Sequence, residues 1–315
     1  MFATRIEPPC ALVIDLWASA SLRTGGDDLA QALWYLGPVV VLLLFLLFEP
    51  LGVLGARLVF AHLVLVALGL TFARSKMKES VVWEEAKAAS ARGESGDEAV
   101  TMSHGHLREL FTRKHIGSMM FLIGMYGFWN LWAGTNGFFF PYILQTVGAQ
   151  SQTTSVLLQT GGFILSMISI AFVFMPLVDK VNQRTLFAVS AIVQIAGMAL
   201  LALFPLTVPV AIAYIVLLQF GGGFGAQSFF QLWSAELFPT LLRSTAQGIT
   251  FAFVRIFLGC WSFFVPLLTA TGFTTLAWIL TGFLVMSGVI GWIWAPRHEG
   301  KSLDDIQREQ AAVPA

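Results

Sequence analysis

The sequence predicts an all-α protein, a polytopic bundle of about eight membrane-spanning helices. Hydrophobic residues make up 57% of the 315-residue chain, charged residues only 11%, and the mean hydropathy is +0.76. An ordinary soluble domain carries about 25% charged residues, so the composition indicates a lipid environment. Eight apolar runs approach the roughly 20 residues that a spanning helix needs. They are Leu33–Val53, Leu58–Ala73, Ile116–Leu144, Val156–Val178, Leu186–Phe204, Pro209–Ala235, Ile249–Leu268 and Phe273–Ala295.

The distribution of Lys and Arg predicts a multi-pass protein of the cell membrane with a cytoplasmic C-terminus. The connection after the second run holds Arg74, Lys76, Lys78, Lys87, Arg92, Arg108, Arg113 and Lys114. If the spans alternate, Arg184, Arg243 and the basic tail lie on the same side, whereas the opposite connections hold only Arg57. Positive residues concentrate in cytoplasmic loops.

A polar linker divides the predicted spans into a group of two and a group of six. We expect an N-terminal segment of unclear structure over residues 1–30, two spans over 31–77, a cytoplasmic linker over 78–113, a six-span unit over 114–296 and a cytoplasmic tail over 297–315. The linker is rich in Ala, Ser, Gly and Glu, which is typical of a solvated connection.

Several classes of function are disfavoured by what the sequence lacks. Cys10 and Cys260 are too few for a disulfide framework, and no Cys/His cluster has zinc-site spacing. The net charge is zero and no basic stripe is interleaved with aromatic residues, which argues against a nucleic-acid partner. The sequence also has none of the common catalytic motifs. We therefore expect no enzyme activity, no cofactor and no metal.

The stretch WSAELFPTLLRSTAQG places Glu236 and Arg243 at the join between two apolar runs. A carboxylate and a guanidinium at such a join belong at a membrane surface, where they can pair and hold two helix ends together. Arg255 lies within the following apolar run. A buried Arg usually faces water or a partner, although one near a span end can extend to the membrane surface.

Four motifs, in order, resemble the major facilitator superfamily, in particular its sugar porter branch and the related metabolite symporters. DKVNQR (Asp179–Arg184) is similar to the D-R-x-G-R-R loop between family spans eight and nine. ELFPTLLRSTAQG (Glu236–Gly248) resembles E-x-F-P-T-x-x-R, PRHEGKSLDDI (Pro296–Ile306) resembles P-E-T-K-G-x-S-L-E-E-I, and KESVVW (Lys78–Trp83) resembles P-E-S-P-R-W.

The resemblance maps the eight runs onto family spans five to twelve, so spans one to four are absent from this sequence. A truncated gene or a mis-assigned start explains this most simply. The alternative is a naturally short form that pairs with another half. Family members hold substrate at the midplane between two six-span halves.

The resemblance also assigns a cytoplasmic gate to Asp179, Arg184, Glu236 and Arg243. Such a network of ion pairs forms when the inner mouth closes and breaks when it opens. Asn182 and Gln183 stand where the family has Gly and Arg, so we expect a weaker network here. The alternative is that these charges only solvate short loops and fix the topology.

Candidate substrate contacts lie in three spans. GFWNLWAGTNGFFFPYIL resembles Q-Q-x-S-G-x-N-x-x-x-Y-Y, which places Asn130, Asn136 and Phe140 at positions of substrate contact. Amides suit a hydroxylated substrate because they both donate and accept, but they could equally bond neighbouring helices. Losing the second Gln at Leu131 and both tyrosines removes several hexose contacts. The further candidates are Gln227, Gln231, Trp233 and Arg255, with Trp233 equally suited to packing.

The sequence therefore predicts a secondary transporter, energised by an ion gradient, for a sugar, polyol or sugar-like organic acid. The partners expected are the lipid bilayer, the substrate and a co-transported proton. Glu49 is the candidate proton-coupling residue if it lies inside the first span, although it could equally lie at the outer end of that span. Arg255 would suit an anionic substrate. The alternative is a membrane fragment or receptor-like relative that keeps the fold without transport.

Overall fold

The structure is a computed structural model that describes residues 27–76, 110–178, 180–238 and 240–296. Regular structure in these ranges is entirely helical. The elements are α2 (Asp27–Phe48), η1 (Glu49–Leu51), α3 (Val53–Ser75), α6 (Arg113–Thr146), α7 (Gln152–Ser169), η2 (Ile170–Phe174), α8 (Met175–Leu177), α9 (Gln183–Leu203), α10 (Val208–Gly223), α11 (Ala226–Leu237), α12 (Thr240–Ser262) and α13 (Phe264–Trp294). The predicted all-α, polytopic class is confirmed.

Seven segments of the described chain are long and apolar enough to cross a membrane. Four of them join consecutive elements end to end: Leu33–Leu51, Gln152–Leu177, Val208–Leu237 and Leu242–Ala270. The one predicted span that is not among these seven is Ile116–Leu144, which lies in α6. Asparagine, tyrosine and tryptophan residues lower the hydropathy of this helix. α13 changes direction at Gly272, so its second part, Gly272–Trp294, is the last span.

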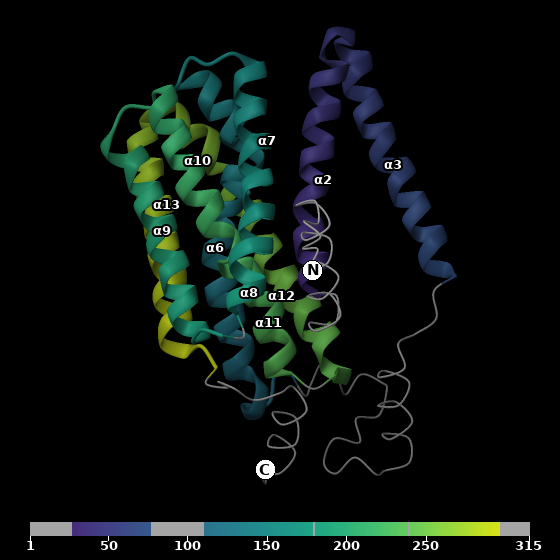
Figure 1. The fold of residues 1–315 in the computed structure, drawn as a ribbon, viewed down its shortest axis with the longest axis vertical. Coiled ribbons are helices and arrows are strands. Elements are labelled where there is room, and N and C mark those ends of the chain that lie inside the picture. Colours follow the sequence, from purple (N-terminus) through teal and green to yellow (C-terminus); the bar gives the residue numbers. More distant parts are fainter. Residues whose placement is uncertain (1–26, 77–109, 179, 239, 297–315) are drawn as a thin grey trace, which may run out of the picture.

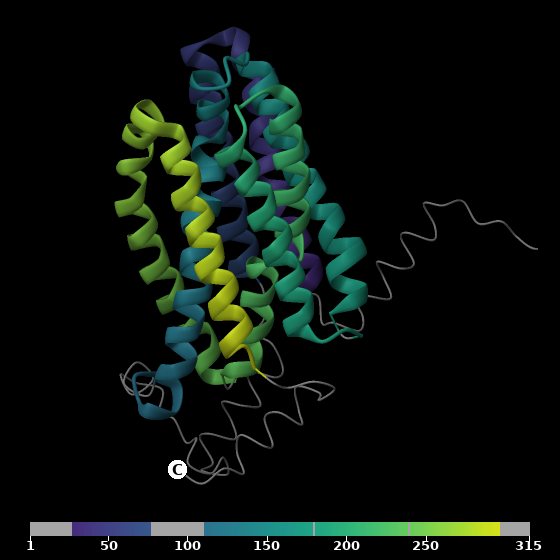
Figure 2. The ribbon, with the colours of Figure 1, turned by 90° about the vertical axis from the view of Figure 1, so that its left-hand side faces the viewer.

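The helices α6, α7, α9, α10 and α13 pack into one bundle, with α12 against α6 and α2 against α7 (Figures 1 and 2). α3 packs on α2 and η1, and most of its surface faces outward. The lower end of the bundle in Figure 1, called the gate end below, contains the start of α6, the α8–α9 turn, the α11–α12 turn and the end of α13.

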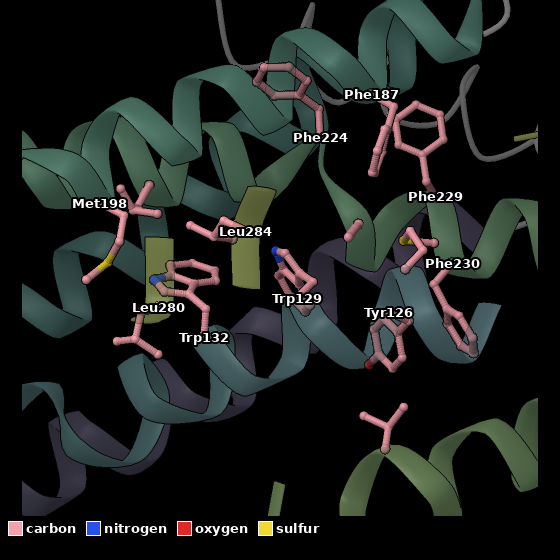
Figure 3. Packing of buried hydrophobic residues seen from close by; sticks show 14 of the residues in the cluster. Tyr126, Trp129, Trp132, Phe187, Met198, Phe224, Phe229, Phe230, Leu280 and Leu284 are labelled. Atoms are coloured by element: carbon pink, nitrogen blue, oxygen red, sulfur yellow. The ribbon is translucent and has the colours of Figure 1, made fainter. Parts of the chain in front are cut away.

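An aromatic core fills the bundle between α6, α9 and α11. Figure 3 shows Tyr126, Trp129 and Trp132 following one another along α6. The ring of Tyr126 stacks on Phe230 with 4.1 Å between centroids. Trp129 also donates from Nε1 to Oε1 of Gln194 at 2.9 Å, so this core contains satisfied polar groups.

The span Val208–Leu237 is broken near its middle, where α10 ends at Gly223 and α11 begins at Ala226. The break occurs in a glycine-rich sequence, and it releases backbone carbonyls inside the bundle. Serine hydroxyls supply hydrogen bonds to these carbonyls: Ser166 to Gln219, Ser169 to Phe220, Ser190 to Gly221 and Ser228 to Gly223. A non-helical backbone is tolerated at membrane depth when its polar groups are satisfied in this way.

Candidate functional site

The break directs the first turn of α11 toward α6, where a polar cluster forms. Tyr126 donates from its hydroxyl to Oε1 of Gln227 at 2.7 Å. Gln227 is only 3% exposed, and its Nε2 has no hydrogen-bond partner among the described residues. Asn130, one turn after Tyr126 on α6, also lies beside the phenol and donates from Nδ2 to the Tyr126 carbonyl at 3.2 Å. The sequence candidates Asn130 and Gln227 are therefore brought together.

Arg255 approaches this cluster from α12. One turn before it, Phe251 meets the Tyr126 ring edge-on, with 5.5 Å between centroids. A further turn back, Gln247 donates to Oε1 of Gln231 at 3.4 Å and to Ser234 Oγ at 2.6 Å. Since residues four apart share a helix face, Arg255 continues the stripe of α12 that faces α6 and α11. Its side chain is exposed and lies within electrostatic range of Tyr126.

Asn136 and Phe140 lie farther along α6 and contact α10 instead. Oδ1 of Asn136 accepts from the Tyr214 hydroxyl at 3.0 Å, and Phe140 packs on the Tyr214 ring at 5.0 Å. Trp132 donates to the same hydroxyl at 3.3 Å. Both Asn136 and Phe140 are buried. The bond of Asn136 to Tyr214 joins two helices, as in the alternative interpretation of the amides. Asn136 and Phe140 therefore lie outside the Tyr126 cluster.

Trp233, which the sequence suggests as a substrate contact, is fully buried near the gate end. Its ring packs against Phe121, Phe187 and Phe229 at centroid distances of 5.5, 5.3 and 4.7 Å. Its Nε1 donates to Oε1 of Gln183 at 2.8 Å. The structure therefore corresponds to the packing interpretation of Trp233, because its polar atom and its ring both contact other side chains of the protein.

Gln183 also reaches the predicted gate. Its Nε2 donates to Oε1 of Glu236 at 3.2 Å, so one amide joins the start of α9 to both Trp233 and Glu236. The family resemblance predicts Gln183 only as a residue that weakens an ion-pair network. The structure shows that it bridges neutral and charged partners, which an amide can do because it carries a donor and an acceptor.

The remaining gate candidates lie at the same end of the bundle. Arg243 donates from Nη2 to the carbonyl of Ala235 at 2.9 Å, so it lies at the α11–α12 turn beside Glu236. Arg184 donates from Nη2 to the carbonyl of Ala295, just beyond the end of α13, where a cation complements the helix dipole. Asp179 lies outside the described residues.

Glu49 lies at the end of the first span, Leu33–Leu51. It begins the 3-10 turn η1 between α2 and α3 and is exposed. α2 ends there because Pro50 cannot continue the helical hydrogen bonds and Gly52 adopts a positive φ of 54°. The structure corresponds to the alternative placement at the end of the first span, and proton coupling by Glu49 stays a prediction.

Sequence reasoning missed Tyr126 and Gln194 as polar members of the bundle interior. Gln194 accepts from Trp129 and donates from Nε2 to Ser190 Oγ at 2.9 Å, beside the break in the α10–α11 span. The signal for Tyr126 was present, because it precedes Asn130 by one helical turn and therefore shares its face.

Comparisons with known proteins agree with this architecture. A protein-family model described as "Sugar (and other) transporter" matches residues 10–309. Over 286 residues the sequence is 40% identical to the Minor myo-inositol transporter IolF of Bacillus subtilis (strain 168), covering 90% of this chain and 65% of that protein. The chain therefore spans about two thirds of the length of this relative.

The fold is similar to two solved structures of XylE. One is a double-tryptophan mutant, at 16% identity, and the other is described as a proton:xylose symporter of the major facilitator superfamily bound to 6-bromo-6-deoxy-D-glucose, at 17% identity. Both give a TM-score of 0.69 and cover 90% of this chain and 66% of the XylE chain. At this identity the likeness shows the fold alone.

Proposed function

The chain belongs to the sugar (and other) transporter family, in the sugar porter branch of the major facilitator superfamily, and from this premise we propose that it serves secondary active transport of a hydroxylated small molecule. The substrate class is a sugar, a polyol or a sugar-like organic acid. The family is one of multi-pass membrane transporters rather than enzymes, in keeping with the seven apolar helical segments.

The observation that carries this proposal is the polar cluster of Tyr126, Asn130 and Gln227 inside an apolar bundle. The free Nε2 of Gln227 is almost entirely removed from solvent, and leaving such a donor unsatisfied costs about 1–3 kcal/mol. A hydroxylated substrate offers oxygen acceptors to this group and hydroxyl donors to the neighbouring amide oxygens. A site built to bind hydroxyls accounts for polar groups that plain packing would not retain.

We propose that the gate end faces the cytoplasm. Described basic residues at this end include Arg113, Lys180, Arg184 and Arg243, whereas Arg57 lies near the opposite end, close to the α2–α3 turn. This asymmetry supports a cytoplasmic C-terminus. The division into two spans over 31–77 and a six-span unit over 114–296 stays a prediction, and most of the expected linker over 78–113 lies outside the described residues.

In this proposal, alternating access uses the contacts at the gate end. Gln183, Glu236 and Arg243 join α9 to the α11–α12 turn, and separating these elements would open the inner mouth. One charge-assisted hydrogen bond biases such a two-state equilibrium by about 1.5–3 kcal/mol. A Glu236→Gln variant should therefore exchange substrate more slowly while still reaching the membrane. A co-transported proton, drawn from the ion gradient, is the proposed energy source.

Binding of labelled myo-inositol to the purified chain in detergent tests the proposed site. Tyr126→Phe removes only the hydroxyl that holds Gln227, and we expect it to weaken binding about twofold to tenfold, as expected for one hydrogen bond. Tyr142→Phe is the matched control, because Tyr142 lies on the same helix and is 43% exposed. Equal binding by the two variants would remove the cluster from the substrate site.

A further inference from the structure

Tyr126, Gln227 and Arg255 together offer more hydrogen-bond donors than acceptors to a bound molecule. The Tyr126 proton is directed at Oε1 of Gln227, so the unused polar atom of that buried amide is its donor, Nε2. Arg255 can only donate, since a guanidinium has no acceptor and stays charged. A neutral polyol needs donors and acceptors in similar number. The Nε2 of Gln227 and the guanidinium of Arg255 instead suit a negatively charged group that only accepts hydrogen bonds.

The two donors come from adjacent helices at similar depth in the bundle. α12 runs beside α6: a Cβ added at Gly127 would lie 3.6 Å from Val254 Cγ2, and Trp261 donates to Thr135 Oγ1 at 2.8 Å. Arg255 therefore lies between the levels of Tyr126 and Thr135, the part of α6 that also contains Asn130. Its stripe of α12 faces α11 as well, because Phe251, one turn earlier, packs on Phe230 at 5.2 Å. Gln227 lies on α11, three residues before Phe230.

The charges of the six-span unit favour an anion with a single negative charge. Among the described residues from Ile116 to Pro296, the basic residues other than Arg255 are Lys180, Arg184 and Arg243, all at the gate end. One cation at membrane depth can balance one carboxylate. A dianionic phosphate would leave an uncompensated charge there, which is costly in a medium of low dielectric constant.

We propose that Gln227 and Arg255 bind the carboxylate of a sugar acid, whose hydroxyls lie toward Asn130. This inference rests on the proposed transport of hydroxylated substrates and narrows it to their acidic members. Arg255 contributes a charge-assisted and geometrically bidentate contact, which is the usual mode of carboxylate recognition by Arg. Gln227 adds the buried donor, and Tyr126 fixes the orientation of its amide.

The experiment compares binding of D-glucuronate and D-glucose to the purified chain, because the two differ only in a carboxylate in place of a hydroxymethyl group. We expect glucuronate to bind about tenfold to hundredfold more tightly, the range for hydrogen bonds to a charged group. Arg255→Leu should abolish this preference, because it weakens glucuronate binding by a much larger factor than glucose binding. Arg57→Leu is the matched control, since Arg57 is exposed on α3 near the α2–α3 turn.

A second variant tests the buried donor independently. Gln227→Glu keeps the shape of the side chain and its bond with Tyr126 but replaces the donor by a carboxylate opposite that of the substrate, so it should weaken glucuronate binding by a larger factor than glucose binding. Arg255→Lys, which keeps the positive charge, should retain part of the preference. Glucose binding equal to or tighter than glucuronate binding would overturn the inference and leave the proposed function standing. Absence of binding for glucose, glucuronate and myo-inositol alike would overturn both.

Discussion

Replacing Trp233 by Ala is expected to destabilise the bundle more than any other single truncation considered for this protein. Trp233 is fully buried, contacts three phenylalanine rings and donates a hydrogen bond to Gln183. Large-to-small changes of this kind cost about 3–5 kcal/mol in soluble cores. We expect the lower part of that range, because lipid is itself apolar and the lost term is mainly packing.

Thermal unfolding of the purified chain in detergent measures this effect as a fall of several degrees in the apparent melting temperature. Trp278→Ala is the matched control, because Trp278 is 50% exposed on α13 and its truncation leaves no internal cavity. Similar melting temperatures for the two variants would contradict the placement of Trp233 in the core.

The second large effect is expected from Gly223→Ala, at the end of α10. A Cβ at this position would lie 2.6 Å from the carbonyl oxygen of Ser166 and 2.6 Å from the Cβ of Ser169, both on α7. A backbone oxygen cannot rotate away, so α7 must move. That movement would also disturb the serine hydrogen bonds to the carbonyls of Gln219 and Phe220. Overpacking of this kind costs about 1–3 kcal/mol.

Gly161→Ala is a control in which the change in stability should have the opposite sign. No atom lies within 4 Å of a Cβ built at Gly161, which is exposed on α7. There the substitution should raise stability by up to about 1 kcal/mol, because Ala favours the helix. A stabilising Gly223→Ala in the same unfolding assay would show that α7 and α10 are not in the close contact described.

The spans could be predicted from the sequence because membrane depth imposes long apolar runs. The run Phe273–Ala295, for instance, coincides closely with the span Gly272–Trp294, and the turn at Gly272 interrupts an otherwise continuous helix. The break between Gly223 and Ala226 was harder to predict from the sequence. It lies inside an apolar run, where hydropathy does not distinguish a continuous helix from a broken one, although the glycines indicated a weakened helix.

The candidate site was predicted in part, because residue type limits the possible partners without choosing among them. Asn130 and Asn136 are equivalent as amides in one span, yet Tyr214 binds Asn136 while Asn130 lies beside Tyr126. The choice depends on the rotation of α10 about its axis, which arises from tertiary packing. Gln183 likewise acquires its role only when Trp233 and Glu236 are brought to it by the fold.

We propose that this chain carries a hydroxylated substrate across a membrane by alternating access. Exchange of labelled myo-inositol into proteoliposomes preloaded with unlabelled myo-inositol tests it most directly, since exchange needs no gradient. We predict exchange above that of protein-free liposomes, and slower exchange by Glu236→Gln. In vesicles that are not preloaded, an inward proton gradient should increase uptake. Uptake no faster than in protein-free liposomes, by a chain that still binds the ligand, would contradict transport and favour a relative that keeps the fold without the translocation path.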